Sequence, residues 1–237
     1  MTVSRSFDIS ILTVYQQCAT DYISHRADEP AIIKSVNFTK MKTIFFDWGG
    51  VVADDPGDDF LTKVLRDVGA SPNQIQEIFQ QYMKQFMRGE ISEVEYWNEL
   101  RSNYGLEIHD SISEEFRKWS GLVANQEVLA LVDKAKDRGW QTAVLSNVIE
   151  PTYNALQEAG LYDKFDAVIA SCKEGLVKPE IGIYQIALER LNVTPEESVF
   201  IDDKQANLNP AIEMGFKVIL AENPRQIIRD VNEVLSA

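Results

Sequence analysis

The fold is decided by the stretch Thr43-Ile44-Phe45-Phe46-Asp47-Trp48-Gly49-Gly50-Val51-Val52. Its first four residues are β-branched or aromatic, which predicts a short buried strand. The strand ends on Asp47, a carboxylate that enters a Gly-Gly turn. Open α/β sheets place their chemistry here, at the carboxyl ends of the strands. Because a buried charge is costly unless a cation compensates it, Asp47 is predicted to belong to a functional site and not merely to cap a turn.

Further polar side chains follow apolar strands in the same way. A strand predicted over 141–145 leads into Ser146-Asn147, and one over 198–201 leads into Asp202-Asp203. Between them, Lys178-Pro179 places an amine before a proline that can open the next helix. In a parallel sheet the carboxyl ends of all strands share one edge. The sequence therefore predicts that these groups converge with Asp47.

The charges of this cluster restrict what it can be. Two unit charges about 4 Å apart repel by roughly 4 kcal/mol at an effective dielectric constant of about 20. Asp47, Asp202 and Asp203 cannot all stay ionised side by side without cations, and Lys178 supplies a single positive charge. A hard divalent ion with oxygen ligands, most naturally Mg²⁺, supplies the rest and keeps positions open for a phosphate. The cluster thus indicates a metal-assisted phosphate site.

Four segments of the chain carry a family resemblance: Phe46-Asp47-Trp48-Gly49-Gly50-Val51-Val52, Leu145-Ser146-Asn147, Gly175-Leu176-Val177-Lys178-Pro179 with Ile183-Tyr184, and Phe200-Ile201-Asp202-Asp203 with Asn207. In this order they resemble the four motifs of the haloacid dehalogenase superfamily. The resemblance spans residues 41–237. It implies an α/β fold with a doubly wound, mostly parallel, Rossmann-like sheet core and an inserted α-helical cap.

The expected organisation follows from this resemblance and from residue periodicity. Residues 1–40 fit no pattern and are expected to be a loosely ordered extension, with Met41 as a possible start of the compact domain. Residues 41–57 and 125–237 are expected to form the core, and 58–124 the helical cap. Within the cap, helices are predicted to end near Gly69 and Gly89, to begin at a capping box on Ser92 and Glu95, and to recur over 113–119.

After the cap, helices and strands alternate. Helices are predicted over about 128–138, 151–160, 181–191 and 211–215, and further strands over 167–170 and 216–220. Alternation of this kind implies parallel strands joined by right-handed crossovers.

The resemblance also implies roles for the site residues. Asp47 is the expected nucleophile and a metal ligand, the Gly49 carbonyl and Asp203 are further ligands, and Asp202 lies behind them or binds through water. Ser146 and the backbone of Asn147 are expected to bind the phosphoryl oxygens, and Lys178 to neutralise them and orient Asp47.

The sequence departs from the family pattern at Gly49, where phosphatases and mutases of the superfamily carry a second Asp that transfers protons. General acid catalysis typically contributes ~10²–10⁴-fold, so leaving groups of low pKa suffer least from its absence. Asp54 or Asp55, just beyond the strand, is a candidate substitute acid, with Asp54 preferred. A phosphomutase, which needs the acid in both directions, is disfavoured.

The Gly-containing first motif and the tract Arg88-Gly89-Glu90-Ile91-Ser92 resemble a bacterial branch that includes α-D-glucose-1-phosphate phosphatases. The segment from Asp202 to Gly215 also resembles the phosphatase domain of soluble epoxide hydrolases. The resemblance thus implies a small phosphomonoester as substrate, with a sugar phosphate favoured.

Two alternatives stay open. A 2-haloacid dehalogenase also lacks the second Asp, but it needs no metal and does not pair Asp202-Asp203 with Lys178. A binding protein with the same scaffold and no turnover is the other alternative, and the intact Asp47, Lys178 and Asp203 disfavour it.

Composition narrows the class of partner. The formal net charge of −14 disfavours nucleic acid or an anionic membrane as a partner, whereas a local metal and lysine can still bind a small anion. The two cysteines, Cys18 and Cys172, show no metal-binding spacing and favour reduced thiols in a cytoplasmic protein. No signal-peptide pattern or membrane-spanning run is found in the sequence.

Overall fold

The computed structural model describes residues 42–54, 57–109 and 123–236, with backbone alone at 57–60. The residues from Lys40 onward form one compact unit. Two predictions, the loosely ordered extension over 1–40 and the helical pattern over 113–119, lie outside the described residues.

The described residues contain a five-stranded, wholly parallel sheet with the strand order β3-β2-β1-β4-β5. The strands are β1 (Thr43–Phe46), β2 (Gln141–Ser146), β3 (Ala167–Ala170), β4 (Ser198–Asp202) and β5 (Lys217–Leu220). Each lies within one residue of its predicted bounds, and the prediction of a parallel α/β sheet is confirmed.

The strand order places a switch point at β1. From β1 the chain winds through β2 to β3, then crosses back to β4 and β5 on the other side of β1. Phe46 pairs with Val144 of β2 and with Ile201 of β4. The residue after β1, Asp47, is therefore level with Asp202 and one residue short of Ser146. Ligands of doubly wound sheets bind at such a crevice.

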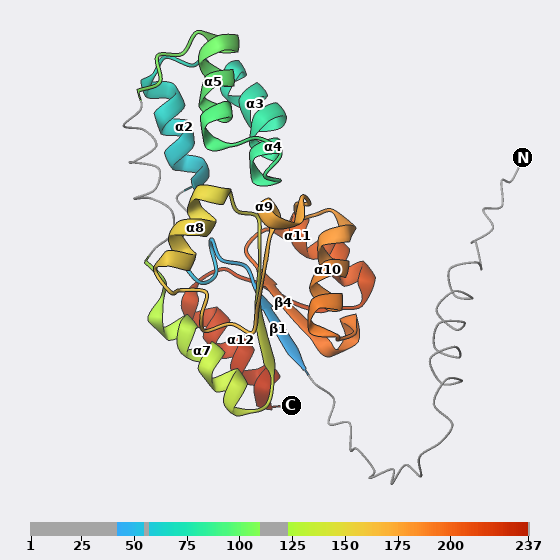
Figure 1. Cartoon of the computed structure of the whole chain (residues 1–237). Helices are drawn as coiled ribbons and strands as arrows, with labels where there is room; N and C mark the ends of the chain where they lie inside the picture. The colour runs from blue at the N-terminus through green and yellow to red at the C-terminus, as the bar shows by residue number, and fades with distance from the viewer. Residues whose placement is uncertain (1–41, 55–56, 110–122, 237) are drawn as a thin grey trace, which may run out of the picture. The chain divides into compact units, whose positions relative to one another are not determined.

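Helices cover both faces of the sheet (Figure 1). They are α7 (Gln126–Asp137), α8 (Glu150–Glu158), α9 (Ser171–Glu174), α10 (Ile181–Leu191), η2 (Pro195–Glu197), α11 (Gln205–Met214) and α12 (Pro224–Ser236). In Figure 1, α7 and α12 lie on one side of β1 and α10 and α11 on the other. The helix predicted over 211–215 is longer than expected and begins at Gln205. No helix among the described residues has the length and apolar character needed to cross a membrane.

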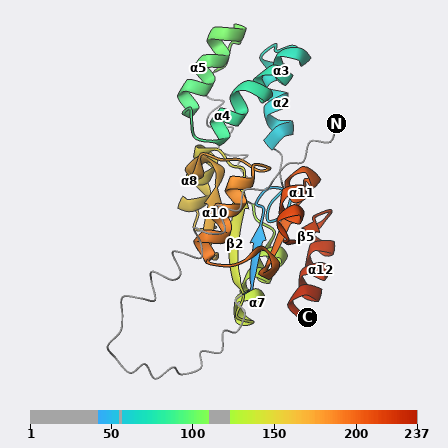
Figure 2. The ribbon, with the colours of Figure 1, turned by 90° about the vertical axis from the view of Figure 1, so that its right-hand side faces the viewer.

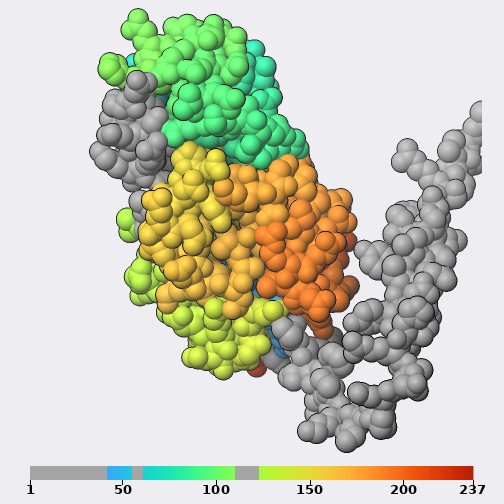
Figure 3. Space-filling model, viewed as in Figure 1, coloured from blue at the N-terminus to red at the C-terminus, as the bar shows by residue number. Residues whose placement is uncertain are grey.

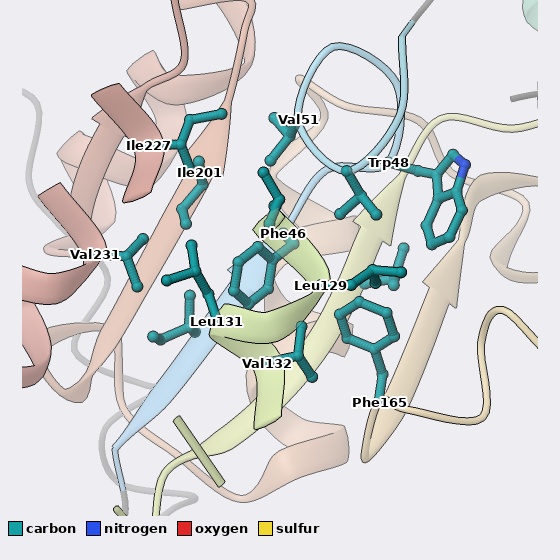
Figure 4. Close-up of a cluster of buried hydrophobic side chains, with 14 of the residues drawn as sticks. Phe46, Trp48, Val51, Leu129, Leu131, Val132, Phe165, Ile201, Ile227 and Val231 are labelled. Atoms are coloured by element: carbon teal, nitrogen blue, oxygen red, sulfur yellow. The ribbon is translucent and has the colours of Figure 1, made fainter. Parts of the chain in front are cut away.

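The side chains of β1 point alternately to the two faces of the sheet, and an apolar core lies on each face. Phe46 belongs to a cluster with residues of α7 and α12, such as Leu131 and Val231, as Figure 4 shows. Its neighbour Phe45 belongs to a second cluster, formed with α10 and α11. Both phenyl rings are fully buried. The two-residue period of a strand thus anchors both layers of helices around the strand that ends at Asp47.

Between β1 and β2 the chain forms a helical insertion, which we define as residues 57–109. Its elements are α2 (Gly57–Asp67), α3 (Pro72–Ile78), η1 (Phe79–Met83), α4 (Lys84–Met87) and α5 (Glu93–Tyr104). The predicted capping box is present, because Ser92 Oγ accepts from the Glu95 amide and Glu95 accepts from the Ser92 amide. The insertion has its own apolar cluster. Figure 2 shows it at the end of the sheet toward which β1 runs.

Two buried tyrosines give opposite predictions for stability. Tyr96 lies in the cluster of the insertion, and its hydroxyl has no hydrogen-bond partner among the described residues. The Tyr184 hydroxyl donates to the Asn207 carbonyl at 2.6 Å. We expect Tyr96→Phe to raise the free energy of unfolding by about 1 kcal/mol and Tyr184→Phe to lower it by about 1 kcal/mol. Urea unfolding followed by circular dichroism measures both, and changes of equal sign would contradict the assignment.

Candidate active site

Asp47 occupies the position predicted for it and is buried. Its amide donates to the Ile201 carbonyl at 2.9 Å, which extends the pairing of β1 with β4. Its Oδ1 accepts from the Trp48 amide at 2.7 Å, and its Oδ2 lies 2.9 Å from Lys178 Nζ. Burial raises the pKa of Asp47 to about 7, against the lowering effect of Lys178 and of a hydrogen bond from Ser146. The free energy of ionising Asp47 therefore depends on the cations around it.

Lys178 connects two carboxylates at the centre of the site. Its Nζ lies 2.9 Å from Asp47 Oδ2 and 2.6 Å from Asp202 Oδ2, and it donates to the Leu145 carbonyl at 2.9 Å. An ammonium group has three N–H donors, so each donor has an acceptor. The side chain is fully buried. Its position is thus set by β1, β2 and β4 together.

Asp202 uses all of its acceptor capacity inside the protein. Oδ2 accepts from Lys178 and from Asn207 Nδ2, at 2.6 and 3.1 Å. Oδ1 accepts from the Lys204 amide at 2.8 Å and from Asn207 Nδ2 at 3.0 Å. A carboxylate offers about four lone-pair directions, and these contacts account for them. The geometry therefore favours Asp202 as the group that orients Lys178 over a role as a direct metal ligand.

The three carboxylates lie close enough together to form a cation site. Asp47, Asp202 and Asp203 each offer an oxygen, and these oxygens lie within 4.8 Å of one another. Asp203 follows the end of β4 and is half-buried. Since Asp202 is engaged, Asp47 and Asp203 are the better pair of ligands, and Gly49, whose carbonyl is the third expected ligand, follows Asp47 by two residues. A set of hard oxygen donors with a surplus of negative charge fits Mg²⁺.

Gly50 leaves the space that Asp203 occupies. A Cβ at Gly50 would lie 2.5 Å from Asp203 Cγ, and the residue has a φ of +74°. We expect Gly50→Ala to weaken Mg²⁺ binding about tenfold or more by displacing the Asp203 carboxylate. The control is Gly139→Ala, where φ is +76° and no atom lies within 4 Å of the added Cβ. Isothermal titration with Mg²⁺ measures both variants, and equal affinities would exclude Asp203 as a ligand.

Ser146 ends β2 and Asn147 follows it, and the side chain of Asn147 contacts the backbone of Lys178. Its Oδ1 accepts from the Lys178 amide at 2.7 Å, and its Nδ2 donates to the Lys178 carbonyl at 2.9 Å. This amide pairing holds the backbone of the lysine, a contact that the sequence did not reveal. The helix predicted over 181–191 is found as α10, and Pro179 lies just before its N-cap residue, Glu180. The bond from Lys178 to Pro179 is cis.

The structure also shows which residues sequence reasoning missed or left unplaced. Asn207, given no role from the sequence, supports Asp202, and its place five residues after Asp202 on α11 was the available signal. Ser171, at the start of α9, and Glu180 reach the insertion from this edge of the sheet. Asp54 is exposed, and no described contact joins it to Asp47. Its part in proton transfer stays a prediction.

Comparisons with known proteins show which family the chain resembles. The model of the haloacid dehalogenase-like hydrolases matches residues 41–215. The sesquiterpene phosphatase astK of Aspergillus oryzae is 30% identical over 75% of this chain and 88% of its own length. The D-ribitol-5-phosphate phosphatase of Bacteroides thetaiotaomicron is 24% identical over 83% of this chain and 100% of its own length.

Other relatives match a smaller part. The (S)-2-haloacid dehalogenase 4A of Burkholderia cepacia is 29% identical over 49% of this chain and 51% of its own length. The chain spans only 24% of the bifunctional epoxide hydrolase 2 of Rattus norvegicus, to which it is 32% identical over 52% of the chain. Among solved structures, a family enzyme of Bacteroides thetaiotaomicron in complex with magnesium and inorganic phosphate has a TM-score of 0.63 at 22% identity, over 77% of this chain and 96% of that one.

Proposed function

The chain belongs to the haloacid dehalogenase-like hydrolases, and we propose that it is a Mg²⁺-dependent phosphatase that hydrolyses a small phosphomonoester through an aspartyl-phosphate. The observation that carries this proposal is the buried pairing of Lys178 with Asp47 and Asp202, beside a third carboxylate on Asp203. The charge of a single lysine does not balance the charges of three carboxylates, so the site is suited to a divalent cation, which can in turn bind an anionic substrate.

In the proposed reaction, an oxygen of Asp47 attacks phosphorus while the bond from phosphorus to the leaving oxygen breaks. Water then hydrolyses the acyl phosphate, which releases inorganic phosphate and restores Asp47. Held by Asp47, Asp203 and the Gly49 carbonyl, Mg²⁺ would neutralise the phosphate and reduce its repulsion of the nucleophile.

The side chains around Asp47 have distinct parts in this proposal. Lys178, fixed by Asp202 and by the Leu145 carbonyl, orients the nucleophile and stabilises negative charge on the phosphoryl oxygens. Ser146, whose single O–H donates to Asp47, would redirect this hydrogen bond to the same oxygens when substrate binds. Asn147 contributes by holding the backbone of Lys178 with its side chain, and its backbone N–H donates to the phosphate.

Protonation of the leaving group is the step for which Gly49 supplies no side chain. We propose that Asp54, which ends the described part of the loop after β1, approaches the leaving oxygen when substrate is bound. In Asp54→Asn, turnover of an alkyl phosphate is expected to fall about tenfold or more, whereas turnover of p-nitrophenyl phosphate, whose leaving group needs no proton, is expected to stay unchanged. Steady-state assays of both substrates measure this, and equal effects would remove Asp54 as the acid.

The proposed substrate class is supported by two relatives. A D-ribitol-5-phosphate phosphatase and a sesquiterpene phosphatase are among the similar proteins. We propose that the insertion is a cap that selects the leaving group, with a sugar phosphate favoured. No role for nucleic acid or a membrane is part of this proposal.

A 2-haloacid dehalogenase is the second candidate, since one such enzyme is similar over half of the chain. It is less favoured because the acidic cluster needs a cation, whereas dehalogenation requires no metal. A panel of sugar phosphates, sesquiterpenyl phosphate, nucleotides and acyl phosphates, assayed with Mg²⁺ and with EDTA, tests the proposal. Chloride release from 2-chloropropionate without phosphatase activity would reverse it, and the absence of both activities would favour a binding protein.

A further inference from the structure

Glu180 follows Lys178 by two residues and directs its side chain away from its own helix. We define residues 177–180 as the Lys178 segment. It is the N-cap residue of α10, yet its side chain caps no helix amide. Its Oε1 lies 2.9 Å from Lys84 Nζ and also bonds to Arg88 Nη2, and its Oε2 accepts from the Val177 amide at 3.3 Å. Both cations come from α4 and the residue after it, in the insertion. One carboxylate thus contacts the insertion and the segment of Lys178.

A second contact joins the same parts of the chain close by. Ser171 Oγ, at the start of α9, accepts from the Val148 amide at 2.9 Å and donates to the Met87 carbonyl at 2.7 Å. A Cβ at Gly89 would lie 2.4 Å from the Cys172 carbonyl oxygen. Only a glycine allows this close approach of two backbones. In Figure 1, α4 and α9 are neighbours, and Figure 3 shows the insertion adjoining the segment from α8 to α10.

The charges at this contact stabilise the position of the insertion against the Lys178 segment, which we call the closed arrangement. Burial raises the pKa of Glu180, but the bonds from Lys84, the Val177 amide and Arg88 outweigh burial and hold that pKa below its usual range. The Glu180 and Arg88 side chains are each 26% exposed, and the Lys84 side chain is 52% exposed. Arg88 is also 3.3 Å from Glu90. The contact is therefore strong enough to favour one position of the insertion over another and weak enough to break.

We propose that Glu180 is a positioning residue that holds the insertion against the Lys178 segment, so that closure over the site and the placement of the lysine are coupled. The coupling follows from the chain itself, because residues 177–180 carry both the amine that contacts Asp47 and the carboxylate that contacts Lys84 and Arg88. An exposed ion pair shifts an equilibrium by up to about fivefold. With two cations on one carboxylate, the ratio of closed to open molecules is expected to change about five- to tenfold when the charge of Glu180 is removed.

Distance measurements between spin labels test this without any assay of activity. The labels are placed at two exposed apolar positions, Val94→Cys on α5 and Ile212→Cys on α11, in a full-length chain with Cys18→Ser and Cys172→Ser. Glu180→Gln keeps an acceptor for the Val177 amide. In this variant, the ratio of molecules with the longer distance to molecules with the shorter one is expected to rise about five- to tenfold.

The matched control is Glu174→Gln. Glu174 lies on α9, and its oxygens are 2.7 and 2.9 Å from Arg190, so it makes an ion pair that does not involve the insertion. Its distance distribution is expected to equal that of the unmodified chain. The double variant Lys84→Gln/Arg88→Gln is expected to match Glu180→Gln, and combining all three changes is expected to add nothing.

The kinetic consequence rests on the proposed phosphatase activity, whereas the distance measurement does not. In Glu180→Gln we expect KM to rise about fivefold and to lose its dependence on salt, since the screened ion pair is gone. A distance shift without phosphatase activity would keep this inference and reject the function. An unchanged distribution in Glu180→Gln, or an equal shift in Glu174→Gln, would overturn the inference.

Discussion

Turnover of phosphomonoesters is expected to fall roughly 10⁴- to 10⁶-fold in Asp47→Asn, as for other enzymes that lose a nucleophile. The amide of asparagine has no negative charge and cannot form the acyl phosphate on which the proposed hydrolysis depends. The fold should persist. Because burial raises the pKa of Asp47 to about 7, a neutral side chain at this position relieves a cost of desolvation.

Intact-mass spectrometry of acid-quenched enzyme during turnover provides the direct measurement. We expect a phosphorylated species in the unmodified protein and none in Asp47→Asn. The matched control is Asp137→Asn, the same chemical change at an exposed position at the end of α7, which should leave both turnover and the phosphorylated species intact. Turnover within tenfold of normal in Asp47→Asn would reject the nucleophile, whatever the substrate.

The second large effect is expected in the stability of Lys178→Met. This change removes the ammonium group from between Asp47 and Asp202 and leaves the Leu145 carbonyl without its donor. Removal of one partner from a buried ion pair typically costs about 3–5 kcal/mol, because the remaining charge has no compensation. We expect a loss of this size in the free energy of unfolding, measured by urea in EDTA, together with loss of turnover.

A double variant separates charge from packing. In Lys178→Met/Asp202→Asn the buried charge of Asp202 is also removed, so half or more of the lost stability is expected to return while turnover stays absent. Lys217→Met is the control, since Lys217 is exposed on β5 and its loss should change stability by less than about 0.5 kcal/mol. If the double variant is less stable than Lys178→Met alone, packing of the lysine stem, not its charge, explains the effect.

Much of the fold was predictable because its signals are local. An apolar run of about four to six residues between turn signals predicts a strand, as Thr43–Phe46 and Ala167–Ala170 are predicted and found. Ser92 and Glu95 form a capping box within four residues. The predictions were less complete where the pattern was weak: α11 begins six residues earlier than expected, and the second helix of the insertion includes a π-helical turn, η1.

Which groups meet was predictable from the sequence, because the carboxyl ends of parallel strands share one edge and each of Asp47, Ser146, Asp202 and Asp203 ends a strand or follows one directly. What each group does there depends on the tertiary structure. Lys178 divides its three donors among β1, β2 and β4, Asn147 holds the lysine backbone, and Glu180 turns to the insertion 92 residues away from it in the chain. The physical reason is that a strand end specifies a position, whereas the partners of each donor and lone pair depend on packing between distant segments.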